Sequence, residues 1–374
     1  MINTKRSVAI IGAGTAGLIA ARELGKTGIS SIVYDQKTRL GVPVRASGIV
    51  SINGLRSIGV DYKKSVTNTL YGARLHAGKS AVFIESKRAV AHVLERRHFN
   101  ELCREQAEAE GARIVLGERV TPSSLNAIGT DNGVVVGADG AVSVVAKHYN
   151  MGELRSYVLT YKAEFDVEVQ DKGIVDLFFD KEYNGLFGWL CPNSEGILEA
   201  GIGIRPGRHG LNSKKVFEGF LHRKEVAGIL SKAKILDGQA SIIPMRLRRR
   251  IVDAGRRVVL VGDAAGQVKP STGGGIVFGG NAAILAAKTI HRYFDGEAEL
   301  WDYESFYKSK YGTDTAIHSV VNRIYSGGWA GGIEFGIKAM RFMGIGSLLG
   351  RYGDMDSPTK MLKNMIFRKS GTDA

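Results

Sequence analysis

The sequence predicts a mixed α/β fold in which a parallel sheet is interrupted by a second, antiparallel sheet. Three observations within its 374 residues carry this prediction. An apolar run at 7–11 leads into the glycine-rich sequence GAGTAG at 12–17 and then into a helical pattern. A second apolar run at 258–261 leads into another glycine-rich sequence, GDAAG at 262–266. Between the two, residues 157–204 contain a series of short strand-like runs.

The glycines of the first motif have separate roles that suit a bound dinucleotide. Gly12 permits the tight turn from strand to helix, Gly14 lets the backbone approach a pyrophosphate, and Gly17 lets the helix pack close to the sheet. The helix predicted over 15–26 offers free N–H groups and a partial positive charge to the phosphates. A second predicted strand ends at Asp35, where an acid suits the ribose hydroxyls of an adenosine. A glycine-rich turn without a ligand is the alternative to this Rossmann-like unit.

The segments between the two motifs are assigned in order from their patterns. Residues 66–90 alternate enough for a short β section, and residues 93–110 form an amphipathic helix that Gly111 ends. The remaining predicted elements are strands at 113–116, 133–140, 157–165, 174–179, 186–190 and 196–204, a helix at 214–230, and a long helix at 275–293.

These elements predict a discontinuous cofactor domain with a substrate domain inserted in it. The Rossmann-like domain is expected at 1–65, 91–150 and 250–300, and the β-rich substrate domain at 66–90 and 151–249. A helical C-terminal region follows at 301–374, with an apolar face over 327–349.

Composition and charge narrow the function classes. The formal net charge is +14, and the densest basic run, RLRRR at 246–250, is also compatible with a solvated turn. Aromatic residues are not interleaved with the basic ones, so no nucleic-acid partner is predicted. An anionic lipid surface or a phosphorylated substrate suits the charge better. The two cysteines, Cys103 and Cys191, exclude a disulfide framework and fit a reducing cytosol.

The sequence predicts a cytoplasmic protein. No apolar stretch reaches bilayer length, because Glu334, Lys338 and Arg341 interrupt the longest candidate. The N-terminus enters a core strand almost at once, which does not fit a secretory signal. Two fates are open for the apolar face near the C-terminus: peripheral contact at the inner face of the cell membrane, or packing on the protein's own body.

The second glycine-rich segment predicts a flavin. Asp263 follows a strand, where its carboxylate can accept hydrogen bonds from ribityl hydroxyls. Gly273, Gly274 and Gly275 open the next helix, whose first N–H groups would face the electron-rich edge of a reduced flavin. A glycine-rich helix start without a ligand is the alternative. Together with the first motif, in this order, the segment predicts FAD bound by both ends of the sequence.

Motifs spread over residues 5–295 resemble the geranylgeranyl reductase family, and within it the archaeal digeranylgeranylglycerophospholipid reductases. The most specific is FGWLCP at 187–192 followed by GIG at 201–203, where the family has aromatic-x-Trp-x-Phe-Pro and then Gly-x-Gly. Two positions depart from the pattern. Cys191 replaces the Phe. Ala46-Ser47 replaces the Cys-Gly of close relatives, and this second departure leaves the substrate and the level of activity open. The other matching sequences are GAGTAG at 12–17, GVPVR at 41–45, VLER at 93–96, GADG at 137–140 and GDAAG at 262–266.

The resemblance implies a set of FAD contacts. A physical argument also supports Arg96 as a contact, because a guanidinium at a helix start can reach the phosphates of the cofactor. A surface ion pair with Glu95 or Glu101 is the alternative for it. The implied FAD contacts are Gly12, Gly14, Ala16, Gly17, Asp35, Gln36, Arg45, Ala46, Arg96, Asp263, Gly275 and Ile276.

The resemblance also implies a substrate channel on two predicted strands. Alternation places Phe187 and Trp189 on one strand face, where aromatic rings can stabilise cationic character on a substrate. Ordinary sheet core is the alternative for both rings. Gly201 and Gly203 also share a face, and their missing side chains are expected to leave space for a bulky chain. The implied substrate residues are Phe187, Trp189, Pro192, Gly201 and Gly203.

The implied reaction is reduction of isolated C=C bonds in the geranylgeranyl chains of archaeal ether lipids or prenyl diphosphates, with hydride from flavin N5. Expected partners are a polyprenyl lipid and an electron donor, either ferredoxin or NAD(P)H. No catalytic residue and no metal site is predicted. His76, His92, His148 and Tyr183 are considered as proton donors, but each has a structural or surface explanation. Two other functions are open: a flavin monooxygenase of the aromatic-hydroxylase type, and a non-catalytic flavin-binding or lipid-binding protein.

Overall fold

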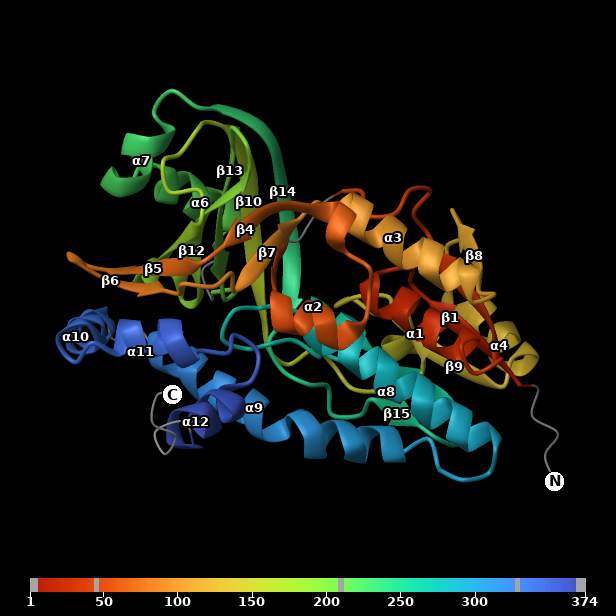
Figure 1. Cartoon of the computed structure of the whole chain (residues 1–374). Coiled ribbons are helices and arrows are strands. Elements are labelled where there is room, and N and C mark those ends of the chain that lie inside the picture. Colours follow the sequence, from red (N-terminus) through yellow and green to blue (C-terminus); the bar gives the residue numbers. More distant parts are fainter. Residues whose placement is uncertain (1–5, 44–46, 208–211, 327–329, 368–374) are drawn as a thin grey trace.

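The structure is a computed structural model of the chain, and it describes residues 6–43, 47–207, 212–326 and 330–367. Figure 1 shows a lobe formed around the N-terminal strand and a second lobe formed by strands from the middle of the chain. The C-terminal helices run beneath both lobes in this view.

The first sheet contains the N-terminal strand. Its order among the described residues is β15-β16-β9-β1-β2-β8, and every neighbouring pair is parallel except β15 and β16. Its central strands are apolar and buried, as expected for a parallel sheet covered by helices. The strands are β1 (Ser7–Ile11), β2 (Ser30–Asp35), β8 (Arg113–Leu116), β9 (Val134–Gly137), β15 (Val252–Asp253) and β16 (Val258–Leu260).

Helix α1 (Thr15–Gly25) follows β1 and packs between two other helices. On one side it contacts α8 (Ile276–Phe294), and on the other it contacts α3 (Arg96–Ala109). The helices and the sheet share the main apolar core of the described residues. Two shorter helices, α4 (Pro122–Asp131) and α5 (Val144–His148), pack against each other near β9.

The second sheet is mostly antiparallel. Among the described residues its order is β14-β10-β13-β12-β11-β5-β6, and only the pair of β11 and β5 is parallel. Helices α6 (Ser213–Leu221) and α7 (Lys224–Leu230) cover one face. The strands are β5 (Gly72–Ala77), β6 (Ser80–Glu85), β10 (Tyr157–Asp166), β11 (Ile174–Phe179), β12 (Gly185–Ser194), β13 (Ile197–Ile204) and β14 (Lys234–Pro244).

A small sheet lies against the other face of the large one. It comprises β3 (Ile49–Ser51), β7 (Ala91–Leu94) and β4 (Val66–Leu70), in that order among the described residues. Helix α2 (Ile52–Ile58) follows β3 and contacts α8. Apolar residues of β4 and β7 pack on those of β12, so the small sheet links the two lobes. Three short 3-10 helices are found in the described residues: η1 (Lys63–Ser65), η2 (Lys181–Tyr183) and η3 (Gly262–Ala264).

The C-terminal part is helical. Helix α9 (Asp302–Ser326) packs along α8 and reaches β12, and α10 (Ala330–Phe342) and α11 (Ile345–Tyr352) pack on the β5–β6 hairpin. Helix α12 (Pro358–Phe367) returns to α9. In the part of the chain that the structure describes, no helix has the length and apolar character needed to cross a membrane.

The predicted fold class is confirmed: a Rossmann-like parallel sheet, an inserted sheet that is mainly antiparallel, and a helical C-terminal region. The proposed domain boundaries stay a prediction. Two predicted helices differ. The helix expected at 93–110 begins at Arg96, because Val93 and Leu94 pair in β7 and the Glu95 carboxylate accepts from the first free N–H groups.

The helix expected at 214–230 is two helices. Arg223 has an extended conformation between α6 and α7, and its guanidinium forms ion pairs with Asp180 and Glu225.

Strand β14 was not predicted, although it pairs with β10 along its whole length. Its sequence is largely exposed at one end and mixes polar with apolar residues, so its pairing depends on β10 rather than on a local pattern.

Candidate cofactor and substrate site

The first glycine motif forms a turn that only glycine permits. Gly12 has φ +108°, and a Cβ there would overlap the carbonyl oxygen of Ala138. A Cβ on Gly17 would overlap the carbonyl oxygen of Gly12, so α1 lies directly on the turn. A Cβ on Gly14, by contrast, would have no atom of the described residues within 4 Å, apart from its two neighbours in the chain. The turn is therefore tightly packed behind Gly12 and Gly17 and open in front of Gly14.

Asp35 lies against this turn. Its Oδ2 accepts from the backbone N–H of Ala13 at 2.8 Å, and its Oδ1 accepts from that of Lys37 at 2.9 Å. The side chain stays partly exposed, and Gln36 next to it is exposed. The structure therefore brings the acid predicted for the ribose to the glycine turn. The contacts of both residues with a ribose stay a prediction.

Arg96 joins α3 to the same turn. Its Nη2 donates to Oγ1 of Thr15, the first residue of α1, at 3.2 Å. Its Nη1 is buried and has no hydrogen-bond partner in the described residues. Burial lowers the pKa of the guanidinium, and the charge of Asp263 acts in the opposite direction. A buried cationic N–H without a partner is costly unless an anion binds it, so this atom fits a phosphate.

The second glycine segment lies on the other side of α1. Asp263 follows β16 in η3, and burial raises its pKa to about 6, while Arg96 lowers it in part. A Cβ on Gly275, the N-cap of α8, would lie 2.8 Å from Oδ1 of Asp263. Ile276 is the first residue of α8 and is partly buried. The acid and the start of this helix therefore meet.

Small residues bring the two glycine segments together. A Cβ on Gly262 would lie 2.9 Å from Cβ of Ala16, and a Cβ on Gly279 would lie 3.0 Å from Cα of Gly262. Helix α8 can approach α1 this closely only because these positions lack bulk. Residues 12–17 and 262–279 therefore line one site although the sequence separates them widely.

The site fits FAD. The open space in front of Gly14, the unpartnered Nη1 of Arg96 among the described residues, and the buried carboxylate of Asp263 beside the start of α8 suit a flavin dinucleotide. Arg45 and Ala46 were also predicted to contact FAD, and they lie outside the described residues.

The predicted substrate residue Trp189 is held by two charged residues that the sequence analysis missed. Its indole Nε1 donates to Oε1 of Glu199 at 2.9 Å, and Lys162 Nζ donates to Oε2 of the same carboxylate at 2.6 Å. All three side chains are at least nine-tenths buried. The alternation of side chains along the strands could have indicated them, because it places Lys162 and Glu199 on the face of the large sheet that the small sheet covers.

The expected space beside Gly201 and Gly203 is filled. A Cβ on Gly201 would overlap the ring of Trp189, and a Cβ on Gly203 would lie 2.6 Å from Cδ2 of Leu186. The expectation of free space was wrong because large side chains of the neighbouring strand β12 cover both glycines. Pro192 is buried in the same strand, and its carbonyl oxygen accepts from Asn68. Whether these residues contact a substrate stays a prediction.

An apolar cluster between the large sheet and the small sheet meets the second glycine segment. Phe187 and Trp189 lie in it with their rings in an edge-to-face arrangement, 6.4 Å between centroids. A Cβ on Gly273 would lie 3.1 Å from Cδ1 of Ile243 and 4.0 Å from Cδ2 of Leu186, so this cluster reaches the start of α8. We call it the apolar wall, and its buried members are Leu70, Ala91, Val93, Val158, Val175, Leu186, Phe187, Trp189, Cys191 and Met245.

A cavity of about 330 Å³ separates α3 from the large sheet. Arg96 lines it from one side, and Lys162 and Glu199 line it from the other. Glu164 also lines it; burial raises the pKa of this carboxyl, and the nearby Glu199 and Asp237 act in the same direction. The cavity therefore connects the arginine of the cofactor site with the polar part of the sheet.

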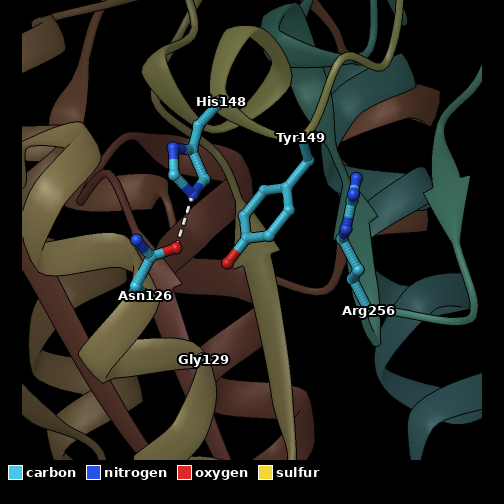
Figure 2. Close-up of a pocket in the computed structure, with 5 residues that line it drawn as sticks. All are labelled: Asn126, Gly129, His148, Tyr149 and Arg256. Atoms are coloured by element: carbon cyan, nitrogen blue, oxygen red, sulfur yellow. Dashed lines mark hydrogen bonds between the residues drawn. The ribbon is translucent and has the colours of Figure 1, made fainter.

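Another cavity, of about 450 Å³, lies away from these motifs (Figure 2). His148 and Asn126 line it and share a hydrogen bond of 3.0 Å, with Tyr149 and Arg256 beside them. None of the predicted cofactor or substrate residues is among those that line it.

The other proton-donor candidates have structural partners. His76 Nε2 lies 2.6 Å from Asp176, and its ring stacks on Phe178. His92 bonds Oγ1 of Thr69 at 3.0 Å. Tyr183 is buried, which raises its pKa to about 12. These contacts agree with the structural explanations expected for them.

The two cysteines of the chain are buried and free. Cys103 is buried in the main core, where burial raises the pKa of its thiol to about 12. Cys191 belongs to the apolar wall, and burial raises its pKa well above the usual value. Both thiols are therefore protonated at neutral pH and act as small apolar groups.

The fold and the family match below define the class of protein: a flavoprotein that binds FAD. The sequence pattern of the family described as FAD binding domain matches residues 5–309. The chain therefore belongs to this family, and the predicted cofactor is confirmed.

Similar proteins agree with the predicted resemblance. The digeranylgeranylglycerophospholipid reductase of Methanothrix thermoacetophila is 29% identical to this chain, over 83% of this chain and 85% of the relative. A geranylgeranyl bacteriochlorophyll reductase-like protein from Thermoplasma acidophilum has a similar structure, with a TM-score of 0.76, 19% identity, and coverage of 96% of this chain and 95% of that one.

The same fold also supports other flavin chemistry. The flavin-dependent brominase Bmp2 superposes with a TM-score of 0.71 at 17% identity, covering 97% of this chain and 98% of that one. Fold likeness at this identity says nothing about the reaction. The choice between reactions has to come from the site itself.

Proposed function

We propose that this protein is an FAD-dependent reductase that hydrogenates isolated C=C bonds in the geranylgeranyl chains of archaeal ether lipids or of prenyl diphosphates. The observation that carries the proposal is the contact between the apolar wall and the second glycine segment at Gly273. A buried hydrocarbon surface beside the expected flavin ring suits a polyprenyl substrate. The lipid reductase named above, similar over most of its length, supports the same choice.

Different residues of the site would bind FAD and the substrate. The backbone at Gly14 and the guanidinium of Arg96 would hold the pyrophosphate of FAD, and Asp263 would accept from its ribityl hydroxyls. Bound and reduced, FAD supplies hydride from N5. The apolar wall would exclude water and orient the chain of the substrate.

Phe187 and Trp189 would contribute more than shape. An unconjugated alkene accepts hydride only when positive charge develops on the neighbouring carbon, and aromatic faces stabilise such charge. The hydrogen bond from Trp189 to the ionic pair of Glu199 and Lys162 fixes the plane of the indole. We infer that these two rings form the part of the wall nearest the double bond.

Lipid mass spectrometry tests this function. The chain would be expressed in a host that makes unsaturated archaeal ether lipids, beside a Gly14→Val variant that cannot admit FAD. Mass gains of two hydrogens per isoprene unit, absent with the variant, are the expected result. Unchanged lipids with a fully FAD-loaded protein, supplied with either reduced ferredoxin or NAD(P)H, would reject the proposal.

Two rival functions have distinct readouts. A monooxygenase of the aromatic-hydroxylase type would consume oxygen in step with its electron donor, whereas the reductase works anaerobically. A non-catalytic flavin-binding or lipid-binding protein would accept electrons from dithionite and would not be reoxidised by any prenyl lipid. Anaerobic stopped-flow spectra of the reduced protein with and without prenyl lipid separate these cases.

We also propose that the C-terminal helices contact an anionic membrane surface. Helix α10 packs Ile337 on the β5–β6 hairpin, while Phe335 and Phe342, seven residues apart, are 71% and 93% exposed. Basic residues accompany this apolar surface, which suits the head groups of the proposed substrate. Its proposed members are exposed apolar residues within 330–367, namely Phe335, Phe342, Met343, Leu348, Leu362 and Ile366, and Lys338, Arg341 and Lys363 are exposed in the same segment. Trp329, also predicted to take part, lies outside the described residues.

Vesicle flotation tests the membrane contact. The expected result is binding to phosphatidylglycerol vesicles that decreases with salt and is weak with phosphatidylcholine. Phe335→Ser/Phe342→Ser should abolish it, whereas Ile235→Ser/Leu236→Ser, which removes exposed apolar residues of β14, should not. Equal flotation of both variants would contradict the proposed surface.

A further inference from the structure

Lys269 lies in the second glycine segment and is held by a distant part of the chain. Its Nζ donates to Oδ1 of Asp356 at 2.9 Å and to the carbonyl oxygen of Met355 at 2.8 Å. The lysine is only 5% exposed. Asp356 lies in the loop between α11 and α12, 87 residues further along the chain. We call residues 353–357 the C-terminal loop.

The backbone of Lys269 forms the turn that precedes α8. Its N–H donates to the carbonyl oxygen of Gly274 at 3.0 Å, and its carbonyl oxygen accepts from the N–H of Gly273 at 2.8 Å. Gly275, which follows Gly274, is the N-cap of α8 and lies against Asp263. Lys269 therefore joins the C-terminal loop to the helix start where the flavin is expected.

Further hydrogen bonds support the same connection. Oδ2 of Asp356 accepts from the hydroxyl of Ser51, which is the N-cap of α2. His318 of α9 bonds Oγ of Ser271 at 2.8 Å with one ring nitrogen and lies 3.3 Å from the carbonyl oxygen of Asp356 with the other. Although burial acts to raise the pKa of Asp356, Lys269 and Ser51 lower it, so the carboxylate stays ionised.

Stability alone does not explain this pair. A buried ion pair often contributes little net stability compared with apolar side chains of the same volume, because both charges lose hydration. Its value lies in the geometry that it enforces. Here the pair is attached to the turn that connects Asp263 with α8.

We propose that Lys269 and Asp356 are positioning residues for the flavin. The C-terminal loop, through this ion pair, holds residues 269–275 in the conformation that receives the isoalloxazine end of FAD. The inference rests on the proposed placement of that ring beside Gly275. It does not depend on the identity of the substrate.

The test compares FAD binding with protein stability in a set of variants. Lys269→Met, Asp356→Asn and the double variant are purified, stripped of FAD and titrated with FAD by fluorescence. Flavin absorbance spectra and midpoint potentials are recorded for the loaded forms. Asp314→Asn is the matched control, because Asp314 holds Ser357 and Thr359 of the same region without contacting Lys269.

The double variant separates positioning from stability. It leaves no unpaired charge, so its thermal stability should recover relative to the single variants. Its Kd for FAD should nevertheless rise at least about tenfold and its flavin spectrum should shift, while Asp314→Asn keeps the wild-type values. Wild-type affinity and spectrum in the double variant, or equal losses in Asp314→Asn, would overturn the proposal.

Hydrogen exchange on the wild-type protein is a second, independent test of the proposal. Coupling between two sites is reciprocal, so FAD should slow amide exchange in the C-terminal loop. Unchanged exchange at 353–357 on saturation with FAD would overturn the proposal even where a variant fails to fold. A wild-type protein that binds FAD but reduces no lipid would reject the proposed function and leave this inference standing.

Discussion

The indole N–H of Trp189 and the ammonium group of Lys162 converge on one buried carboxylate, that of Glu199, at 2.9 and 2.6 Å. The three residues come from neighbouring strands of the large sheet. They place an ionic pair directly behind an aromatic ring of the apolar wall. The ring is therefore oriented by charge, whereas packing alone would leave its plane less defined.

Glu199→Gln should destabilise the protein by about 3–5 kcal/mol, because it leaves the buried Lys162 charge unpaired. Lys162→Met/Glu199→Gln should recover much of that loss, since no charge is then left without a partner. Urea unfolding of the two variants measures both effects. Equal stability of single and double variants would show that Lys162 is neutral or solvated in the native state.

Gly201→Ala should disturb Trp189, because the added Cβ would overlap the indole ring. The expected loss of stability is about 1–3 kcal/mol, with a changed near-UV circular dichroism spectrum. Gly219→Ala in α6 is the control: outside its own helix backbone, its Cβ would meet no atom of the described residues within 4 Å, and alanine favours a helix over glycine. A Gly201→Ala protein as stable as the control would contradict the placement of the ring.

The two ends of the first motif should respond differently to alanine. Gly17→Ala should unfold or strongly destabilise the protein, because its Cβ would overlap the backbone of the turn. Gly14→Ala should leave the FAD-free protein stable and weaken FAD binding, since its Cβ projects into the open space. Thermal unfolding and FAD titration of both variants measure this. FAD affinity unchanged in Gly14→Ala would place the pyrophosphate elsewhere.

Arg96→Met should lower FAD affinity by about 10-fold to 100-fold, the range expected for a lost charge-assisted hydrogen bond. The FAD-free protein should be no less stable, because Nη1 has no partner among the described residues and its burial is unfavourable. Arg96→Lys keeps the positive charge but lacks the planar set of N–H donors. Its affinity for FAD should therefore lie between those of the wild type and Arg96→Met. A marked loss of FAD-free stability would instead make Arg96 a structural residue.

The FAD-free protein should lose stability as the pH rises from 4 to 6, because the buried carboxyl group of Asp263 loses its proton in this range. Its native pKa, about 6, lies above its ordinary value of 3.8 because of burial, so folding takes up a proton in this window. The contribution is complete below pH 3.8 and lost above about pH 6. It is worth up to roughly 3 kcal/mol.

Urea unfolding across this pH range, with Asp263→Asn beside the wild type, isolates that contribution. The variant should lack the decrease that the wild type shows. Identical pH profiles for the two proteins would mean that the carboxylate is solvated in the FAD-free state.

Much of the cofactor site could be predicted from the sequence, because its signals are local. The turn at Gly12 and the helix start at Gly275 each follow from residues within a few positions, and the acid at Asp35 follows from the spacing within one strand–helix–strand unit. The substrate side was harder to predict. The expected gap beside Gly201 is filled by Trp189 from the next strand, and no local pattern reports what a neighbouring strand places there.

By itself the sequence determined the parallel sheet, the glycine turn and FAD as the cofactor, since strand and helix periods and the freedom of glycine act over short distances. Only the tertiary structure decided that η3 and α8 approach α1 at Ala16, that Glu199 orients Trp189, and that Asp356 holds Lys269. These contacts depend on strand register and helix packing between residues far apart in the chain. Local propensity contains no information about either.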